Sequence, residues 1–520
     1  MKKTLFLAAL LVCAGVAAVY AAIVPGLRAE REQEVAAFLA SLPGEVKAGS
    51  IRVELLPGNV ILRDFTGRFA GSGQSSLEFS APEFVIKGLG GAGLMDALFG
   101  KRPADTGAKG RPPALLARGA SASGFCLTLK HQMEGTHELL TEDIRTSGIV
   151  LRDITGDLDA LVACLLPDAS LQERLHAAAG FSAALLQITG YSKNISLPLL
   201  GNGSFLADNL TLRDVGLFHL GKGVWEGLSA TIGGERVLSV ERITLEGLYL
   251  PDVSDALLAL EQSPEDEVAT GIFAALEKEP LVVNNLELTD LRLLLGTTGQ
   301  VYAKRLALDI SGDLEKMRLR HTAEDLCLPP GLLALPGGPY AAFAAAYAKN
   351  LCVSAELDMT GTHTGGKGDL DLSRCLLDAA DLGALSFTGS LAYEDEGEER
   401  YFDSDLKLYL RQGEVLITER NMAEYAIRAS LAGAEQPDEE QLKLLRGHLI
   451  SAILLDAQNS GQKSGGQGTK AFLEGFAKLV EGPGSLRVVF TPNEPVSLDS
   501  DDFLNEANPA VEFTAAPQAE

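Results

Sequence analysis

The stretch Asn209-Leu210-Thr211-Leu212-Arg213-Asp214 decides the fold class, because its apolar and polar residues alternate with a period of two. Successive side chains of a β-strand point to opposite faces of the sheet, so a strand with one buried face needs this alternation. The pattern returns as Asn285-Leu286-Glu287-Leu288-Thr289-Asp290. The sequence therefore predicts a β-rich unit that the chain uses more than once.

A shorter form of the motif occurs in residues 61–67 (ILRDFTG), 150–156 (VLRDITG) and 211–216 (TLRDVG). The irregular spacing argues against a tight solenoid and for β-rich units separated by variable inserts. Each Arg-Asp pair has two interpretations, an ion-binding or catalytic pair, or the solvated end of a strand that enters a turn. The second interpretation is favoured, because such pairs are common where strands meet turns.

The composition excludes several classes of protein. Hydrophobic residues make up 46% of the 520 residues, which permits large cores and excludes wholesale disorder. The 70 acidic and 44 basic residues give a net charge of −26, whereas a nucleic-acid binder needs a basic surface. The six cysteines show no C-x-x-C spacing, so zinc and thioredoxin-type sites lack their usual signature and small buried hydrophobes are the favoured interpretation.

The amino terminus predicts a membrane-crossing helix. Lys2 and Lys3 precede residues 4–24, which carry no charge. At about 1.5 Å per residue this run spans about 32 Å, enough for a bilayer core of about 30 Å. A signal anchor is favoured. The alternatives are a signal peptide cleaved after Val19-Tyr20-Ala21 and a lipoprotein attached at Cys13.

The predicted fold class is mainly β with α inserts: an N-terminal membrane helix, repeated antiparallel β units that form one or more curved sheets, and a helical C-terminal portion. The predicted domains are 1–27 (signal anchor or signal peptide), 28–156 (first β-rich unit), 157–280 (second β-rich unit with helical inserts), 281–420 (third β-rich unit) and 421–520 (helical portion with a terminal strand and tail). Within the last portion we expect helices over 438–456 and 469–481, a mobile loop over 458–468, a strand over 486–490 and a tail after residue 505.

No motif predicts catalysis, a cofactor site or a metal site. Residues 88–93 (GLGGAG) match G-x-G-x-x-G, but the surrounding chain is not a βαβ unit, so a flexible turn is favoured over a nucleotide site. None of the seven histidines belongs to an H-E-x-x-H motif. The acidic residues 394–399 lack the alternating ligands of a calcium loop and are typical of a solvated hairpin tip. We therefore expect a protein that is not an enzyme.

One basic segment stands out in this acidic chain. It contains a single acidic residue, Asp105, and five basic ones: Lys101, Arg102, Lys109, Arg111 and Arg118. Such a segment is a candidate contact for anionic lipid head groups or a protein partner, and a merely flexible loop is the alternative.

The N-terminal span, the stretch 46–62 (VKAGSIRVELLPGNVIL) and the repeats NLTLRD and NLELTD together resemble the AsmA-like and TamB-like envelope proteins of Gram-negative bacteria. The resemblance implies a single-pass inner-membrane protein with its bulk in the periplasm. A secreted or periplasmic protein after signal cleavage is the alternative. The resemblance also implies a role in lipid transport, with phospholipid and an envelope protein as candidate partners. The helical region after residue 420 departs from the long-bridge pattern of the family.

A long antiparallel sheet with one apolar face must cover that face with helices, with a second sheet or with lipid. An uncovered face is a lipid-sized groove, and its candidate lining residues are Ile51, Val53, Leu55, Val60, Leu62, Leu210, Leu212, Leu286 and Leu288. A closed core is the alternative for these positions. The expected function is to bind or move lipid or to assist envelope assembly. The alternative is a structural or interaction protein with closed β modules and a helical docking surface.

Overall fold

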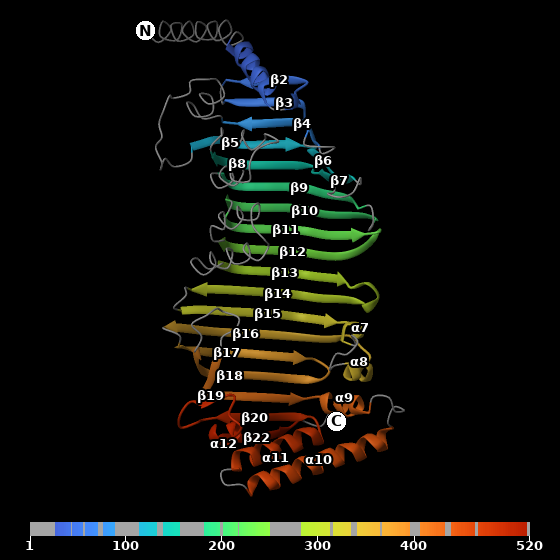
Figure 1. The fold of residues 1–520 in the computed structure, drawn as a ribbon, viewed down its shortest axis with the longest axis vertical. Coiled ribbons are helices and arrows are strands. Elements are labelled where there is room, and N and C mark those ends of the chain that lie inside the picture. The colour runs from blue at the N-terminus through green and yellow to red at the C-terminus, as the bar shows by residue number, and fades with distance from the viewer. Residues whose placement is uncertain are drawn as a thin grey trace, which may run out of the picture. The chain divides into compact units, whose positions relative to one another are not determined.

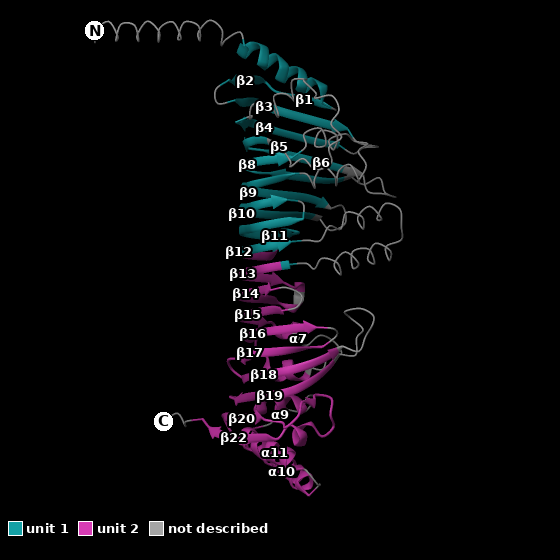
Figure 2. Cartoon of the chain, turned by 90° about the vertical axis from the view of Figure 1, so that its left-hand side faces the viewer, with its two compact units in different colours: residues 1–236, 242–282 teal, residues 237–241, 283–520 magenta. Residues whose placement is uncertain are grey.

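The structure is a computed structural model in which antiparallel strands predominate (Figure 1). It divides into two compact units, unit 1 (residues 1–236 and 242–282) and unit 2 (residues 237–241 and 283–520), which Figure 2 shows in different colours. The structure describes residues 27–42, 44–55, 58–70, 76–88, 114–132, 139–156, 181–197, 201–216, 218–249, 282–312, 316–333, 341–364, 367–395, 406–431, 438–462 and 466–516. The helical inserts expected within 157–280 lie outside these residues.

The described part of unit 1 begins with a helix over residues 27–41 and continues as antiparallel strands (Figure 1). Its strands are β1 (Glu45–Lys47), β2 (Ser50–Glu54), β3 (Asn59–Ala70), β4 (Ser76–Lys87), β5 (Ala114–Ser123), β6 (Cys126–Gln132), β7 (Leu139–Arg145), β8 (Gly148–Gly156), β9 (Ser182–Leu197), β10 (Gly201–Gly216), β11 (His219–Ile232) and β12 (Glu235–Tyr249), of which residues 237–241 are assigned to unit 2. β1 and β2 both pair with β3, β5 and β6 both pair with β4, and β7 and β8 both pair with β9. In each case, two short strands pair with different parts of one long strand and together occupy one position in the sheet.

The aspartates of the repeated motif have a left-handed backbone inside their strands. Asp64, Asp153 and Asp214 have φ of 49°, 47° and 54°, and they lie in β3, β8 and β10. The interpretation of the Arg-Asp pairs as strand ends is therefore wrong for Asp64 and Asp153. Aspartate is one of the few side chains that tolerate this conformation.

The left-handed residue shifts the phase of the side-chain alternation. Val60 and Leu62 precede Asp64 at even positions and belong to a buried apolar cluster. Phe65 and Phe69 follow Asp64 at odd positions and pack against the same cluster. The left-handed residue thus keeps apolar side chains on the same face while the chain changes phase. This is the physical reason for the repeated Asp, which the alternation alone did not reveal.

Replacing Asp153 by valine will destabilise the fold, because a β-branched side chain at φ 47° is strained. We expect Asp153→Val to lower the free energy of unfolding by about 2 kcal/mol, measured by urea denaturation. Asp153→Gly is the matched control and should be neutral or slightly stabilising, because glycine adopts this conformation freely. Equal effects of the two substitutions would contradict the proposed role of the left-handed backbone.

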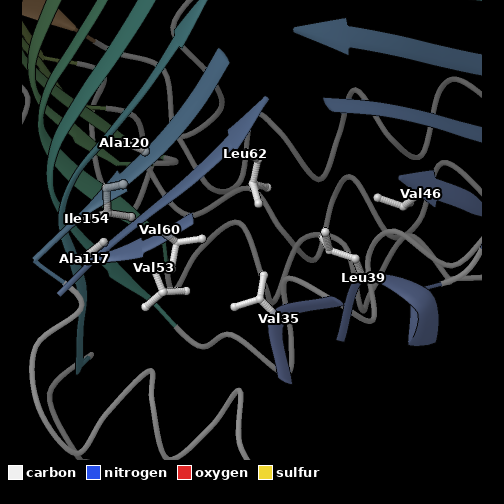
Figure 3. Packing of buried hydrophobic residues seen from close by; sticks show 9 residues of the cluster. All are labelled: Val35, Leu39, Val46, Val53, Val60, Leu62, Ala117, Ala120 and Ile154. Atoms are coloured by element: carbon white, nitrogen blue, oxygen red, sulfur yellow. The ribbon is translucent and has the colours of Figure 1, made fainter. Parts of the chain in front are cut away.

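The helix over residues 27–41 packs its apolar side on the first strands of unit 1. Figure 3 shows Val35 and Leu39 from this helix beside Val53, Val60 and Leu62. The cluster continues through Val46, Ala117, Ala120 and Ile154. Glu32 on the same helix also accepts a hydrogen bond from the backbone N–H of Val53 at 3.1 Å. The helix therefore closes one end of the unit 1 sheet.

The predicted membrane crossing is corrected. Among the described residues, no helix is both long enough and apolar enough to cross a bilayer, which contradicts the predicted single-pass inner-membrane protein. The described N-terminal helix carries Arg28, Arg31, Glu32 and Glu34, which form ion pairs along one side of it. The uncharged segment 4–24, on which the prediction rested, lies outside the described residues.

Unit 2 consists of antiparallel strands of the same 22-stranded sheet, with helices at its C-terminal part (Figure 1). Its strands are β13 (Val282–Leu294), β14 (Gln300–Gly312), β15 (Lys316–Leu328), β16 (Leu351–Thr364), β17 (Lys367–Ala379), β18 (Gly383–Asp395), β19 (Leu406–Glu419), β20 (Gly484–Phe490), β21 (Val496–Ser497) and β22 (Pro509–Ala515). Its helices are η1 (Gly296–Thr298), α7 (Pro330–Leu333), α8 (Ala341–Tyr347), α9 (Met422–Ser430), α10 (Glu439–Gly461), α11 (Gln467–Glu481) and α12 (Phe503–Glu506). β13 to β19 pair in chain order, β20 and β21 both pair with β19, and β22 pairs with β20.

The C-terminal helices and strand broadly follow the sequence, with two differences. α10 extends to Gly461, so part of the predicted loop over 458–468 is helical. The predicted tail after residue 505 contains β22, which pairs with β20 along its whole length. Val511 and Phe513 of β22 pack into the cluster formed by α11 and β20, which explains why this terminal segment is ordered.

A disulfide links Cys327 of β15 to Cys352 of β16, which are paired directly across the two strands. The prediction that the cysteines are small buried hydrophobes is wrong for this pair. The two residues lie 25 positions apart, and only the register of β15 on β16 brings them together. The bond links the two ends of the segment between these cysteines, which carries α7 and α8.

Alkylation without a reductant should therefore leave Cys327 and Cys352 unmodified and label the free thiols of Cys126 and Cys375. Peptide mass spectrometry measures the modification. After reduction, both disulfide cysteines should react. Cys327→Ser with Cys352→Ser should lower the free energy of unfolding by about 3 kcal/mol, since the crosslink limits the unfolded chain. Alkylated Cys327 in the unreduced protein would contradict the disulfide.

Candidate functional site

One face of the unit 1 sheet carries two uninterrupted apolar ladders, in which residues stand opposite one another on successive strands. Directly paired residues of an antiparallel sheet share a face. The first ladder, from β2 to β11, is Val53, Val60, Ile86, Ala120, Leu151, Leu186, Leu212 and Gly223. The second is Ile51, Leu62, Phe84, Ala122, Ile149, Ile188, Leu210 and Trp225.

A third ladder continues the same face beyond the left-handed positions. It comprises Gly67, Phe79, Leu127, Ile144, Lys193, Phe205 and Ala230. The ring of Phe65 lies 5.4 Å from that of Phe84 in the second ladder and 5.1 Å from that of Phe79 in the third, so both ladders face the same side. We call these three ladders, with the residues that flank them on that side, the apolar face of unit 1.

Unit 2 has an apolar face of the same construction. One ladder is Leu286, Leu308, His321, Leu357, Cys375, Phe387, Val415, Val488 and Val511. The neighbouring ladder is Leu288, Leu306, Ala323, Ala355, Leu377, Leu385, Ile417, Leu486 and Phe513. α11 covers the end of this face, where Leu486 and Val488 are completely buried.

All the predicted groove residues except Leu55 lie on these ladders, and they fall into two groups. Val53, Val60 and Leu62 belong to the cluster that the helix over 27–41 closes, and Ile51 and Leu55 pack against the same cluster. Leu210, Leu212, Leu286 and Leu288 are half-buried and belong to neither of the two buried clusters. The first group therefore packs in or against a buried core, whereas the second group stays half-buried outside both cores.

Large apolar side chains stay exposed in the unit 2 ladder. Leu377 of β17 and Leu385 of β18 are paired opposite each other, and they are 48% and 46% exposed. A ladder that filled a closed core would bury such residues, as it does at Leu486. Adjacent exposed leucines on a continuous apolar face are typical of a binding surface.

The opposite face of the unit 2 sheet carries ion pairs instead. Asp309, Arg320, Asp358 and Arg374 stand opposite one another on β14 to β17 with alternating charge. The Nε and Nη2 atoms of Arg318 donate to the Asp358 carboxylate at 3.0 and 2.7 Å. These hydrogen bonds lower the pKa of Asp358, although its burial acts in the opposite direction. The two faces of the sheet therefore differ sharply in polarity.

The lowered pKa of Asp358 predicts a pH-dependent contribution to stability. Folding favours the ionised carboxylate, so this contribution is complete above the ordinary pKa of 3.8 and is lost as the pH falls through the lower pKa of the folded state. We expect Asp358→Asn to lower the melting temperature by about 3 °C at neutral pH. The difference from wild type should shrink below the ordinary pKa. Thermal unfolding from pH 7 to pH 3 measures it, and a constant difference would contradict the assignment.

One ion pair lies on the apolar face of unit 1. Lys193 of β9 stands between Ile144 and Phe205 in the third ladder, and Glu142 of β7 stands between Leu129 and Ile195 in the next row. The Lys193 Nζ lies 2.8 Å from the Glu142 carboxylate, and the side chains are 27% and 21% exposed. Among the described residues of this face on β2 to β11, these are the charged ones. Sequence reasoning missed the pair, because only the strand register places the two residues side by side.

The predicted basic segment is described only at its end. Arg118 lies on β5, where its side chain packs over Gly88. Lys101, Arg102, Lys109 and Arg111 lie outside the described residues, as do most of the residues in the G-x-G-x-x-G match. The prediction of a contact for anionic head groups there stays a prediction.

Within the described part of the chain, no cluster of three or more His, Cys, Asp or Glu side chains is placed to hold a metal ion. Comparisons of the chain with protein-family models, with curated proteins and with solved structures returned no match. The resemblance to AsmA-like and TamB-like proteins stays a prediction, and the geometry of the ladders is the basis for a functional proposal.

Proposed function

We propose that the protein binds lipid acyl chains along the apolar faces of its two units, without a catalytic residue, and so carries lipid or assists envelope assembly. The observation that supports this proposal best is the solvent exposure of two paired leucines, Leu377 and Leu385, on the apolar face of unit 2. Each methylene of an acyl chain that such a surface removes from water contributes about 0.8 kcal/mol. A chain laid along several ladder positions therefore gains enough to bind without a specific polar contact.

The construction of the faces also supports acyl chains over compact ligands. Each ladder repeats the same chemistry from strand to strand, so it offers a long surface rather than one enclosed pocket with convergent polar groups. The ion pairs lie mainly on the opposite face, as at Asp358 of unit 2. A flexible hydrocarbon chain fits a surface that is apolar over several strands and has few directional contacts.

Leu385→Asp tests the proposal in unit 2, because this exposed side chain can be replaced without opening a core. A carboxylate on the apolar face should reduce co-purified lipid about tenfold, since an acyl chain cannot compensate the desolvated charge. Mass spectrometry of the organic extract of the full-length protein measures the lipid, and circular dichroism checks the fold. Thr388→Asp, on the opposite face of β18, is the matched control and should retain lipid.

Leu212 provides the corresponding test in unit 1. A photo-reactive benzoylphenylalanine at position 212 should form a crosslink to lipid, whereas the same group at Thr211, on the other face of β10, should not. This measurement does not require a destabilising substitution. Absence of lipid from the wild-type protein, or equal crosslinking at both positions, would overturn the proposal in favour of a closed core.

A second candidate function is an interaction protein that docks a partner through α10. Leu444 and Leu455 lie on the outer side of this helix and are 59% and 58% exposed, while Leu442 and Ala457 on its inner side are buried. If this function holds, a photo-crosslinker at position 455 should yield one defined protein adduct in cells, and Leu444→Glu should abolish it. A lipid-free protein that forms such an adduct would favour this function over lipid binding.

A further inference from the structure

The ion pair between Glu142 and Lys193 is an exception on a face that is otherwise apolar. Removing a charged group from water costs free energy, which a partner only partly restores. An ion pair that links β7 to β9 could stand equally well on the polar face, where both charged groups stay hydrated. The position of this pair, half-buried among Ile144, Ile195 and Phe205, therefore calls for an explanation beyond strand pairing.

We propose that Glu142 and Lys193 form the head-group site for a zwitterionic lipid, of which phosphatidylethanolamine is the example, when its acyl chains occupy the apolar face of unit 1. This inference rests on the proposed lipid binding and adds its specificity. The lipid phosphate accepts a hydrogen bond from the Lys193 ammonium, and the ethanolamine ammonium donates one to the Glu142 carboxylate. Each of the two side chains thus exchanges its protein partner for the group of opposite charge in the lipid head group.

Charge complementarity selects this class of head group. The Glu142–Lys193 pair has no net charge, so a purely anionic head group would gain Lys193 but would face the Glu142 carboxylate at close range. A zwitterion leaves all four charges compensated, which matters most in surroundings of low polarity. A primary ammonium also donates N–H hydrogen bonds, whereas the quaternary ammonium of phosphatidylcholine has no N–H to donate.

Among the described residues, the positions directly paired with Glu142 and Lys193 are all apolar. Ile144, Phe205, Leu129 and Ile195 occupy the directly paired positions beside the two residues. The ring of Phe205 meets the ring of Tyr191 edge-on at 6.0 Å, which makes a rigid aromatic wall next to Lys193. Partial exposure leaves both charged groups accessible to a head group, while the apolar neighbours favour displacement of water by the lipid.

The test measures lipid selectivity rather than total binding. The purified full-length protein is incubated with vesicles of equimolar phosphatidylethanolamine, phosphatidylcholine and phosphatidylglycerol, then re-isolated, and its bound lipids are quantified by mass spectrometry. We expect wild type to enrich phosphatidylethanolamine about tenfold over each of the other lipids, as befits charge-assisted hydrogen bonds. Glu142→Gln and Lys193→Met should each bring the bound ratio back to that of the vesicles while total lipid stays within about twofold.

Lys222→Met is the matched control, because Lys222 forms its ion pair with Glu246 on the polar face of the same unit. This variant should keep the selectivity of wild type. A merely structural ion pair would change the melting temperature of the Glu142 and Lys193 variants without changing the lipid ratio, and that result would overturn the inference. Bound lipid in the vesicle ratio on wild type would overturn the inference alone, whereas a lipid-free wild type would overturn the proposed function as well.

Discussion

Direct cross-strand registration is the constraint on which the rest of this structure depends. Each antiparallel pair places partners on the same face, so a single apolar residue such as Leu288 has an apolar partner on the next strand. Repeated over successive strands, this local rule produces a ladder, and adjacent ladders produce a face. A slip of one residue on any strand would move all its apolar side chains to the polar face. The register is therefore maintained by burial on one side and by ion pairs such as Asp358 with Arg318 on the other.

The left-handed aspartates and the strand irregularities solve the same geometrical problem in different ways. Asp64 and Asp153 change the phase of the alternation within a strand, and the neighbouring strands adapt without losing their pairing. In unit 2, an extra residue in β17 near Ser373 allows Leu372 and Cys375 to remain on one face. A bulge bends its strand and increases the local twist, while the ladder continues on either side of it. The apolar face is thus preserved along strands that ideal alternation would not sustain.

The sequence predicted what depends on one strand at a time. The alternation around Leu212 and Leu288 identified strands and the face that their leucines share, and the phase of Leu442 and Leu445 identified α10. Properties that depend on two strands were not accessible in this way. The Cys327–Cys352 bond and the Glu142–Lys193 pair exist only because of particular registers, and β22 is ordered because α11 and β20 cover it.

Each unit combines a closed region of its apolar face with an accessible region. The helix over residues 27–41 covers the first strands of unit 1, and α11 covers the last strands of unit 2, so each unit has one region with a buried core. Such a core supplies the stability that a sheet with an accessible face lacks. The remaining strands are then free to carry exposed leucines such as Leu377 without loss of the fold. In the proposed function, lipid would replace water on this existing surface, and the core would keep its conformation. The Glu142–Lys193 pair belongs to β7 and β9 and lies outside the buried cluster that the helix over residues 27–41 closes. The proposed selection of head groups therefore does not depend on residues of that core.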